Sequence, residues 1–413
     1  MRILVCHNFY RHHGGADVVM LHTQEFLEAR GHEVIPFAMR HPENLPSPYA
    51  EYFVRQVDYA TIRPWQVITI AAEAARILFS VEAYRKISAL IRRTKPDLVH
   101  CHNIYHELSP SILLPPKRAG IPVVLTLHDY KLMCPNRKMY VGGQICEKCL
   151  GGNYLHAVKH RCVYDSRLGS MLCAMEGFAH RRLYRTLIDT FISPSQFLKD
   201  KMVQAGFPAE RIVRIPNAVP IASRQPAFKP GEYALFLGLL VQEKGASVLI
   251  EAMKRMPDVP LRIAGRGYLE EELREEVERS GLKNVEFAGF VTGDRLEELV
   301  TNCRFVVLPS SSYENYPMAI LDAFSWGKPV VGSALGGIPE LITPGEHGML
   351  ANPGDPDDLA EKMSALWNDP GLAVEMGRKA RARIETELSP ETYIKKVLAV
   401  YDDVLARRRP DQG

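Results

Sequence analysis

The sequence predicts an α/β protein built from two doubly wound parallel sheets. Short runs of β-branched residues alternate with longer amphipathic segments along most of the 413 residues, as expected of buried parallel strands covered by helices. A chain of this length is too long for one ordinary hydrophobic core, so two domains are expected. A stretch with four prolines and no periodicity, IPNAVPIASRQPAFKPGE (residues 215–232), predicts the linker between them.

The first domain is predicted to span residues 1–218 and to contain the helix GADVVMLHTQEFLEARG and six strands, which are RILVC, HEVIPF, DLVHCH, PVVLTLH, TFISPS and RIVRIPN. The second domain, residues 219–390, is predicted to contain helices such as ASVLIEAMKRM and YLEEELREEVERSG. Its five predicted strands are YALFLG, PLRIAG, VEFAG, RFVVLPS and PVVGSA. Residues 391–413 are predicted to form a C-terminal helix that packs back on the first domain.

The composition is that of a soluble globular protein, with 46% hydrophobic and 24% charged residues. The 51 basic and 48 acidic residues are too balanced to indicate a nucleic-acid partner. The start, MRILVCHNFY, is typical of a first strand rather than a signal peptide, and no apolar run is long enough to span a bilayer. We therefore expect a cytoplasmic protein with reduced cysteines.

The stretch SSYENYPMAILDAF (residues 311–324) connects a predicted strand to a predicted helix. Pro317 suits the first helical position, because its φ angle is fixed and it has no N–H. A helix N-terminus there favours an anion or a polyhydroxylated ligand, which Glu314 and Asp322 would help to bind. The alternative is that Glu314 caps the helix and Asp322 lies on a solvated face.

Ligands of open parallel sheets bind beyond the carboxyl ends of the strands, and two facing sheets would present these ends to one cleft. Gly15 and Gly265 would let backbone N–H groups approach a phosphate at a helix start. Lys244 would neutralise a diphosphate, Arg266 lies in a similar strand–glycine–helix loop, and the backbone near Phe290 would meet a flat base. The alternative for each is an ordinary turn or surface residue.

Histidines also follow the predicted strands. His128 and Asp129 end the strand of LTLHDY, where a histidine can move a proton or donate to an oxyanion. The alternative is a local hydrogen bond. The run HCHNIYH places three more histidines close together, but it lacks a fourth ligand, so a structural role is favoured over a metal site for His100, His102 and His106.

Four cysteines lie in a glycine-rich insertion at about residues 131–165, which has no predicted hydrophobic core of its own. They form a C-x11-C-x2-C-x12-C pattern that would suit a structural zinc site, with free thiols as the alternative: Cys134, Cys146, Cys149 and Cys162. The other four are expected to be small buried residues: Cys6, Cys101, Cys173 and Cys303.

Basic residues are frequent in and after this insertion: Lys159, Arg161, Arg167, Arg181, Arg182 and Arg185. The apolar helical region PWQVITIAAEAARILFSVEAYRKISALIRR (residues 64–93) also ends in basic residues. Together they would favour an anionic membrane surface or a lipid-diphosphate acceptor. Core helices with solvated basic ends are the alternative, and the sequence favours it.

Taken together, the motifs resemble the retaining glycosyltransferases of family 4, which have the GT-B fold. The resemblance covers about residues 1 to 390 and rests on nine motifs in order: GGAD, TLHDY, SPS, IPNAV, EKG, AGRG, FAGFV, ENYPMAILDAF and GGIPELI. The insertion after TLHDY is similar to those of bacterial surface-polysaccharide and cell-envelope transferases.

The resemblance implies a role for each of the following candidate site residues. Glu314 would hold the sugar hydroxyls of a nucleotide-sugar, Asp322 the ribose hydroxyls, and Lys244 would offset the charge on the leaving diphosphate without a metal. His128 would lie near the sugar and the acceptor. Backbone groups of the following residues would meet the sugar and diphosphate: Asn315, Tyr316, Pro317 and Met318.

Two positions depart from the family pattern. The family usually has an arginine where this chain has Leu239, so another basic residue such as Arg266 would have to supply that charge or transfer would be slow. The second acid is Asp322 instead of glutamate, which is one methylene shorter and requires a closer helix or an intervening water.

The resemblance predicts a retaining transferase that moves a sugar from a UDP- or GDP-sugar to a glycan or lipid-linked acceptor, with no cofactor required for catalysis. It would act in the cytoplasm, with a peripheral contact to the inner face of the membrane as a further hypothesis. Two alternatives stay open: a nucleotide-sugar-binding protein that has lost turnover, and a GT-B sugar-nucleotide epimerase. Product analysis without acceptor would separate the epimerase from the transferase.

Overall fold

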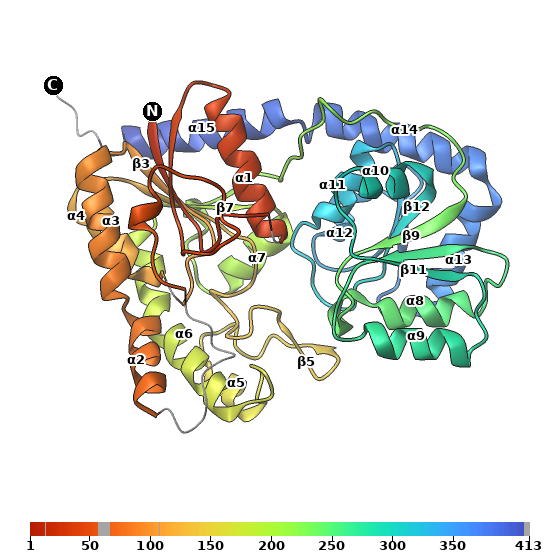
Figure 1. The fold of residues 1–413 in the computed structure, drawn as a ribbon, viewed down its shortest axis with the longest axis horizontal. Coiled ribbons are helices and arrows are strands. Elements are labelled where there is room, and N and C mark those ends of the chain that lie inside the picture. Colours follow the sequence, from red (N-terminus) through yellow and green to blue (C-terminus); the bar gives the residue numbers. More distant parts are fainter. Residues whose placement is uncertain (13, 57–66, 107, 409–413) are drawn as a thin grey trace. The chain divides into compact units, whose positions relative to one another are not determined.

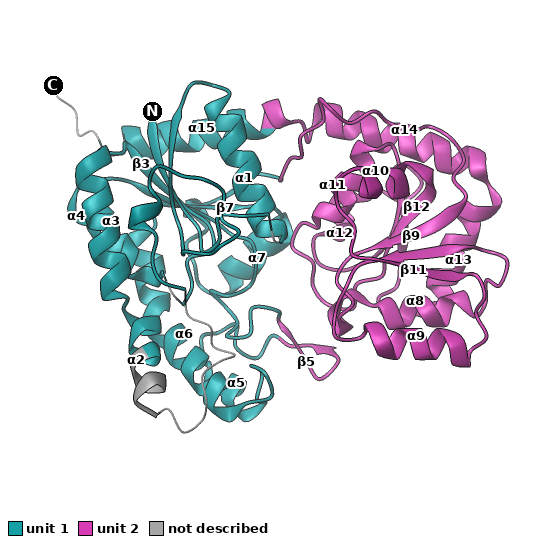
Figure 2. Cartoon of the chain, in the orientation of Figure 1, with its two compact units in different colours: residues 1–138, 147–216, 393–413 teal, residues 139–146, 217–392 magenta. Residues whose placement is uncertain are grey.

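A computed structural model describes residues 1–12, 14–56, 67–106 and 108–408, and two six-stranded parallel sheets form its framework (Figure 1). The chain divides into two compact units (Figure 2). Unit 1 comprises residues 1–138, 147–216 and 393–413, and unit 2 comprises residues 139–146 and 217–392. The predicted insertion is thus shared, because residues 139–146 cluster with unit 2 instead of with the rest of the first domain.

Unit 1 contains a parallel sheet of order β2-β1-β3-β4-β7-β8. All six predicted strands are present: β1 (Arg2–Cys6), β2 (Glu33–Phe37), β3 (Leu98–Cys101), β4 (Val123–Thr126), β7 (Thr190–Ser193) and β8 (Ile212–Arg214). The α-helices are α1 (Gly15–Glu28), α2 (Val67–Leu78), α3 (Val81–Thr94), α4 (Leu114–Arg118), α5 (Leu155–Lys159), α6 (Arg167–Leu187) and α7 (Gln196–Gln204). Short 3₁₀ turns are η1 (Ala50–Tyr52), η3 (Pro110–Leu113) and η4 (Ala209–Arg211).

The predicted helical region at residues 64–93 corresponds to α2 and α3, although residues 64–66 lie outside the described part of the chain. Among the described residues, we find no helix that combines the length and the apolar character needed to cross a membrane.

Unit 2 contains a second parallel sheet, of order β11-β10-β9-β12-β13-β14. Its strands are β9 (Tyr233–Leu237), β10 (Leu261–Ala264), β11 (Val285–Gly289), β12 (Cys303–Leu308), β13 (Val330–Ser333) and β14 (Gly348–Ala351). Its helical segments are η5 (Gln242–Lys244), α8 (Ala246–Met253), α9 (Glu270–Arg279), α10 (Gly293–Asn302), α11 (Met318–Ser325), α12 (Ile338–Leu341), α13 (Pro356–Asn368) and α14 (Pro370–Thr386). Strand β14 was not predicted, because its sequence GMLA lacks the β-branched residues that mark a strand.

Both sheets reverse their strand order at one point, and this places the candidate sites. In unit 1 the chain passes from β1 to β2 on one side and then to β3 on the other, so the reversal lies between β1 and β3. In unit 2 it lies between β9 and β12. Ligands of doubly wound sheets bind beyond the carboxyl ends of the strands at such a point.

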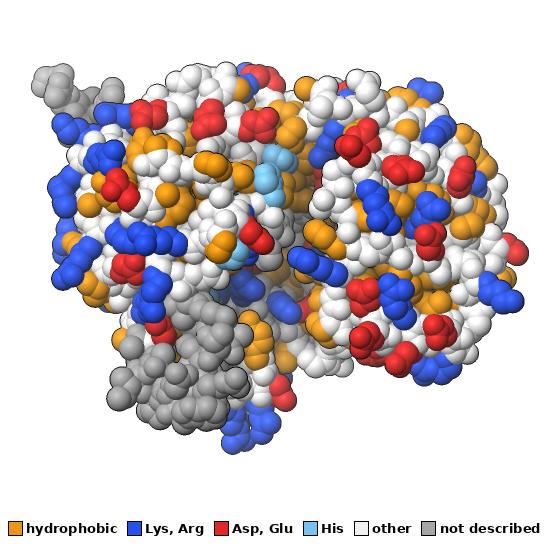
Figure 3. Space-filling view, in the orientation of Figure 1, with side chains coloured by type: hydrophobic (Ala, Val, Ile, Leu, Met, Phe, Trp, Pro, Cys, Tyr) orange, Lys and Arg blue, Asp and Glu red, His pale blue; other side chains and the backbone are white. Residues whose placement is uncertain are grey.

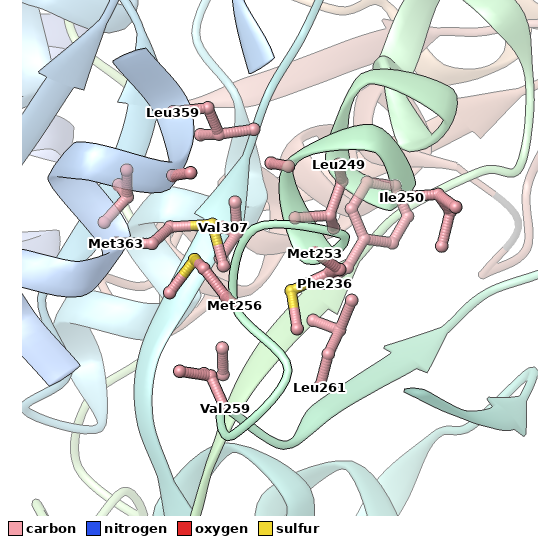
Figure 4. Close-up of a cluster of buried hydrophobic side chains, with 14 of the residues drawn as sticks. Phe236, Leu249, Ile250, Met253, Met256, Val259, Leu261, Val307, Leu359 and Met363 are labelled. Atoms are coloured by element: carbon pink, nitrogen blue, oxygen red, sulfur yellow. The ribbon is translucent and has the colours of Figure 1, made fainter. Parts of the chain in front are cut away.

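One of two buried hydrophobic clusters in unit 2 joins the sheet to the helices α8 and α13 (Figure 4). Phe236 from β9 is fully buried next to Leu249 and Met253 of α8, and Met363 of α13 belongs to the same cluster. Each buried side chain of this size contributes roughly 1.5–3 kcal/mol relative to an exposed one. This packing fixes the strand ends that carry the candidate site.

The outer surface of unit 2 is different in character. Over α8 and α9, basic and acidic side chains are intermingled (Figure 3). Lys254 illustrates this, because its Nζ lies 2.6 Å from Glu251 and 2.7 Å from Glu276.

The cysteine-containing insertion does have a small core, contrary to the prediction. Tyr154 is 1% exposed and packs with Cys149, Ala157 and Ala174, the last of which belongs to α6. Gly177 leaves room for the ring, since a Cβ there would lie 2.8 Å from Tyr154 Cδ2. The sequence did not reveal this core because Ala174, which completes it, comes from the helix that follows the insertion. The insertion also forms a two-stranded hairpin, β5 (Tyr140–Val141) and β6 (Gln144–Ile145).

The C-terminal helix α15 (Pro390–Ala406) carries two buried tyrosines whose hydroxyls bind unit 1. Tyr393 and Thr23 of α1 share a hydrogen bond of 2.7 Å between their hydroxyl oxygens. The Tyr401 hydroxyl oxygen lies within hydrogen-bond distance of His100 Nδ1 in β3, at 2.6 Å. Residues 393–406 are therefore part of the structure that surrounds the histidines of the first sheet.

Candidate functional site

Glu314 and Lys244 meet at the reversal point of the second sheet. Lys244 ends η5 after β9, and Glu314 follows β12, the strand beside β9. Lys244 Nζ donates to Glu314 Oε1 at 2.6 Å, and Ser310 Oγ donates to the same oxygen at 2.7 Å. The glutamate side chain is 11% exposed and the lysine side chain 29%. A cation and a carboxylate at one strand edge can bind a phosphate and neighbouring hydroxyls together.

Glycines let the backbone approach this pair closely. Gly245 has φ +70°, and a Cβ there would lie 1.8 Å from the carbonyl oxygen of Pro309. Gly336 has φ +63°, and its Cβ would lie 2.4 Å from the carbonyl oxygen of Glu314. That same oxygen accepts a hydrogen bond from Gly337 N at 2.7 Å. The loops that carry Lys244 and Glu314 are thus held in a geometry that only glycine permits.

The loops after β9 and β10 also run against each other. Leu240 N donates to Arg266 O at 2.9 Å, and a Cβ on Gly265 would lie 1.8 Å from the oxygen of Gly238. At the end of β11, Phe290 is 59% exposed, and the Arg266 guanidinium carbon lies 4.4 Å from its ring centroid. The structure therefore brings the predicted residues Gly265, Arg266 and Phe290 together as a flat cationic and aromatic surface.

Helix α11 begins at Met318, so the predicted position of Pro317 inside the helix is wrong. Pro317 is the N-cap residue, because its ψ of 121° is extended although its φ of −67° would suit either conformation. The described hydrogen bonds of the Glu314 carboxylate go to Lys244 and Ser310, which does not support the alternative that Glu314 caps the helix.

Asp322 has a partner that was not predicted. Arg224, from the linker, donates to Asp322 Oδ1 at 2.6 Å and to Ser325 Oγ at 2.6 Å. Arg381 of α14 donates to the Arg224 carbonyl oxygen at 3.1 Å. Asp322 is therefore oriented by an arginine that is distant in sequence. The residue types and their spacing in the sequence do not predict this ion pair.

In unit 1, histidines gather beyond the carboxyl ends of β1, β3 and β4. His102 Nδ1 lies 2.8 Å from His128 Nε2, and the two rings are stacked with centroids 5.1 Å apart. The ring of His7, directly after β1, is 6.0 Å from that of His102. The ring of His100, inside β3, is tilted against that of His102, with the two centroids 4.4 Å apart. His7 and His102 were not predicted as site residues, although the reversal-point rule applied to their strands would have indicated them.

Asp17 connects this cluster to the first helix. Gly14 N, at the N-cap of α1, donates to Asp17 Oδ2 at 2.8 Å, while Asp17 Oδ1 accepts from His7 Nε2. Because His7 Nδ1 accepts from Asn103 N at 3.1 Å, the imidazole proton is assigned to Nε2. Gly15, predicted to contact substrate, is exposed at the start of this 14-residue helix.

Burial keeps the imidazoles of His100, His102 and His128 neutral. It lowers the pKa of His100 to about 3 and holds the pKa values of His102 and His128 well below the ordinary range. It also raises the pKa of Asp129, the neighbour of His128. A neutral His128 can donate or accept one hydrogen bond at physiological pH but brings no positive charge to a ligand.

In the part of the chain that the structure describes, no group of three or more His, Cys, Asp or Glu side chains is arranged to hold a metal ion. Cys149 and Cys162 share the small core around Tyr154, and Cys134 Sγ donates to Asn136 Oδ1 at 2.9 Å. Cys146 lies in the hairpin that belongs to unit 2. A structural zinc at these four cysteines stays a prediction, to be tested by metal analysis of the purified protein.

Two family models match the chain. The model of Glycosyltransferase Family 4 matches residues 13–223, more than half of the sequence, and that of Glycosyl transferases group 1 matches residues 221–383. The chain belongs to glycosyltransferase family 4. The resemblance that the sequence motifs indicated is thereby confirmed.

Individual relatives of this glycosyltransferase are distant. A glycogen synthase of Mycobacterium tuberculosis is 27% identical over 332 residues, which cover 78% of this chain and 71% of that protein. The uncharacterized glycosyltransferase MJ1607 of Methanocaldococcus jannaschii is 25% identical over 406 residues, which cover 94% of each chain.

Solved structures confirm the predicted GT-B fold. Sucrose-phosphate synthase of Thermosynechococcus elongatus matches with a TM-score of 0.72 at 18% identity, covering 98% of this chain and 99% of that one. The Anabaena protein Alr3699/HepE, in complex with UDP-glucose, matches with a TM-score of 0.67 at 19% identity, covering 98% of this chain and 100% of that one.

Proposed function

We propose that this glycosyltransferase moves a sugar from a UDP- or GDP-sugar to a glycan or lipid-linked acceptor with retention of configuration at the anomeric carbon. The observation that carries the proposal is the Lys244–Glu314 pair at the reversal point of the second sheet, with both side chains within 2.7 Å of a partner. Family membership and the complex of HepE with UDP-glucose support a nucleotide-sugar donor.

In this proposal the donor replaces the contact between the two side chains. The Lys244 ammonium binds the diphosphate and stabilises the negative charge that develops as the nucleoside diphosphate leaves. The sugar hydroxyls donate to the Glu314 carboxylate, and the ribose hydroxyls donate to Asp322. The leaving phosphate accepts the proton of the attacking hydroxyl on the same face of the sugar. His128 serves as a neutral hydrogen-bonding group near the sugar, and none of these steps requires a metal.

Arg266 supports turnover despite the leucine at position 239. The Leu240 backbone N–H donates a hydrogen bond to the Arg266 carbonyl oxygen. Arg266 therefore lies in a loop that contacts the residue next to position 239, where the family usually has arginine. Leu239 itself is 53% exposed. We infer that Arg266 supplies the second cation on the diphosphate.

A second candidate, a nucleotide-sugar-binding protein without turnover, is favoured by the apolar and exposed Leu239 alone. Leu239→Arg separates the two. No change in rate means that Arg266 already compensates, whereas a gain of about tenfold or more means that the natural site lacks a needed cation.

The donor is identified by measuring nucleoside diphosphate release from a panel of UDP- and GDP-sugars, with and without acceptor extracts. The proposal predicts slow acceptor-free hydrolysis of one donor, which Glu314→Ala abolishes and Glu375→Ala, at an exposed residue of the same unit, does not. Equal release by Glu314→Ala would contradict the assigned site. An isomerised donor in place of free sugar would identify an epimerase.

A further inference from the structure

The exposed side of α6 carries a row of large apolar side chains. Leu168, Met171, Met175 and Phe178 recur at spacings of three and four residues, which places them along one side of the helix. Each is between 44% and 49% exposed. In the preceding segment, Leu155 and Tyr164 are 63% and 95% exposed. Six of the fourteen large hydrophobic side chains that are exposed in the described chain thus fall within 24 residues.

Arginines continue the same row. Arg182 and Arg185 follow Phe178 at the same spacing, and both are exposed. They border a hollow of about 590 Å³ whose lining is Phe178, Arg181, Arg182, Arg185, Thr186, Gly206, Pro208 and Arg211. The Arg181 guanidinium is committed to the protein, since it donates to the Tyr154 hydroxyl at 3.2 Å and to the Ala205 carbonyl. The Arg182 and Arg185 side chains form no ion pair with any residue that the structure describes.

Acidic side chains are nearly absent from this surface. The one acidic residue of α6, Glu176, is buried and lies 2.8 Å from Lys131 Nζ. From Leu155 to Arg185 the sequence has six Lys and Arg residues against two acids, and the second acid is Asp165. The exposed face of α6 is therefore apolar along three turns and cationic at its C-terminal end.

We propose that this face of α6 docks the protein on an anionic phospholipid surface. Leucine, methionine and phenylalanine enter the boundary between headgroups and acyl chains, Tyr164 lies at the headgroup level, and the arginines bind lipid phosphates. A second copy of the chain would bring an identical set of arginines to the contact, so charge favours a lipid surface over self-association. The proposal does not depend on the donor or on turnover, since vesicle binding is measured without either.

The test is co-sedimentation of the full chain with vesicles of phosphatidylcholine, alone or mixed with phosphatidylglycerol. We expect binding to the mixed vesicles, weakened by salt, and little binding to phosphatidylcholine alone. Arg182→Glu/Arg185→Glu should lower the partition coefficient by more than about tenfold. Met175→Ser/Phe178→Ser should lower it by a similar factor through lost apolar burial. Lys395→Glu/Lys396→Glu on α15, with the same change of charge on exposed residues, should bind like wild type.

Circular dichroism of each variant establishes that it is folded. The proposal is overturned if wild type shows no preference for the anionic vesicles, or if the arginine double variant binds them like wild type. It is also overturned if sedimentation velocity shows dimers that Met175→Ser/Phe178→Ser dissolves while vesicles are not bound. Nucleotide binding measured on the same variants should be unchanged, which separates failure of this proposal from failure of the proposed reaction.

Discussion

Lys244 and Glu314 neutralise each other across 2.6 Å at the reversal point of the second sheet. Because both side chains retain some exposure, their attraction contributes at most about 1 kcal/mol to stability. The glycines that bring the two loops together have a clearer effect, since side chains at positions 245 and 336 would collide with backbone oxygens.

Replacing Lys244 by methionine separates these two contributions. We expect kcat to fall by about 10² or more, because the cation that offsets the leaving diphosphate is lost, while stability changes by less than about 1 kcal/mol. Steady-state kinetics and thermal unfolding measure the two effects. Lys254→Met, which removes an ion-paired lysine from the surface of the same unit, is the control, and an equal loss of kcat there would contradict the assignment.

At the scale of single residues, the sequence predicted the candidate site residues that follow strands within recognisable motifs: Lys244, Gly265, Arg266, Phe290 and Glu314. It did not predict Arg224 or Ser310. Arg224 lies in the linker, 98 positions before its partner Asp322, and only the folded chain brings them together. Asp17 was not predicted as a partner of His7, because their pairing depends on how α1 begins at Gly14, which the sequence does not specify.

At the scale of elements, a buried ion pair fastens α6 to the loop that follows β4. Lys131 and Glu176 are both nearly inaccessible and lie 2.8 Å apart. Burial alone would lower the pKa of Lys131, but Glu176, together with Cys173 and Asp129, outweighs it, so the pKa of Lys131 is raised. Burial opposes the charge of Glu176 in the same way, yet Lys131 and His106 hold its pKa well below the usual range.

Glu176→Gln should destabilise the protein by about 3–5 kcal/mol, because it leaves the Lys131 ammonium buried without a counter-charge. Lys131→Met/Glu176→Met should cost much less than the single change, since neither charge remains. Denaturant unfolding measures both. Glu375→Gln, at the exposed pair with Lys379, should change stability by less than about 1 kcal/mol. A double variant that is less stable than Glu176→Gln would contradict this account.

Most strands and the long helices could be predicted because they are long enough to show their own periodicity. The exceptions have local physical causes. The hairpin of β5 and β6 turns at Gly142 and Gly143, which have φ of +59° and +78°, but each of its strands has only two residues and no apolar alternation. At Pro317 the proline fixes φ but leaves ψ free, so residue type alone could not decide on which side of the helix boundary it lies.

At the scale of the whole molecule, the sequence predicted two parallel sheets and a linker. The structure shows both sheets, and the strand order reverses after the second strand of unit 1 and after the third strand of unit 2. In each unit the candidate site residues lie beyond the carboxyl ends of the strands beside that reversal. The assignment of residues 139–146 to unit 2 could not be predicted, because it results from contacts distant in sequence.

The buried histidines of unit 1 make stability depend on pH. His100 titrates near pH 3 in the folded protein and near 6.5 when unfolded, so between these values only the unfolded chain binds the proton. Stability is complete above about pH 6.5 and falls as the pH is lowered toward 3. His100→Asn should reduce the slope of unfolding free energy between about pH 6.5 and 5 by up to 1.4 kcal/mol per pH unit.

Chemical denaturation at several pH values measures this slope, and the window lies above the range in which ordinary carboxylates titrate. His12→Asn, at an exposed position, is the control and should leave the slope unchanged. Identical slopes for His100→Asn and wild type would contradict the assigned burial of a neutral imidazole.

Calorimetric titration of the full chain with UDP and with GDP tests the central claim most directly, because it requires neither the sugar nor the acceptor to be known. The account predicts one site per chain for one of the two nucleotides and an affinity at least about tenfold lower in Lys244→Met, which loses the cation facing the diphosphate. Lys254→Met should bind like wild type. Absence of binding for both nucleotides, or equal binding by Lys244→Met, would contradict the proposed site.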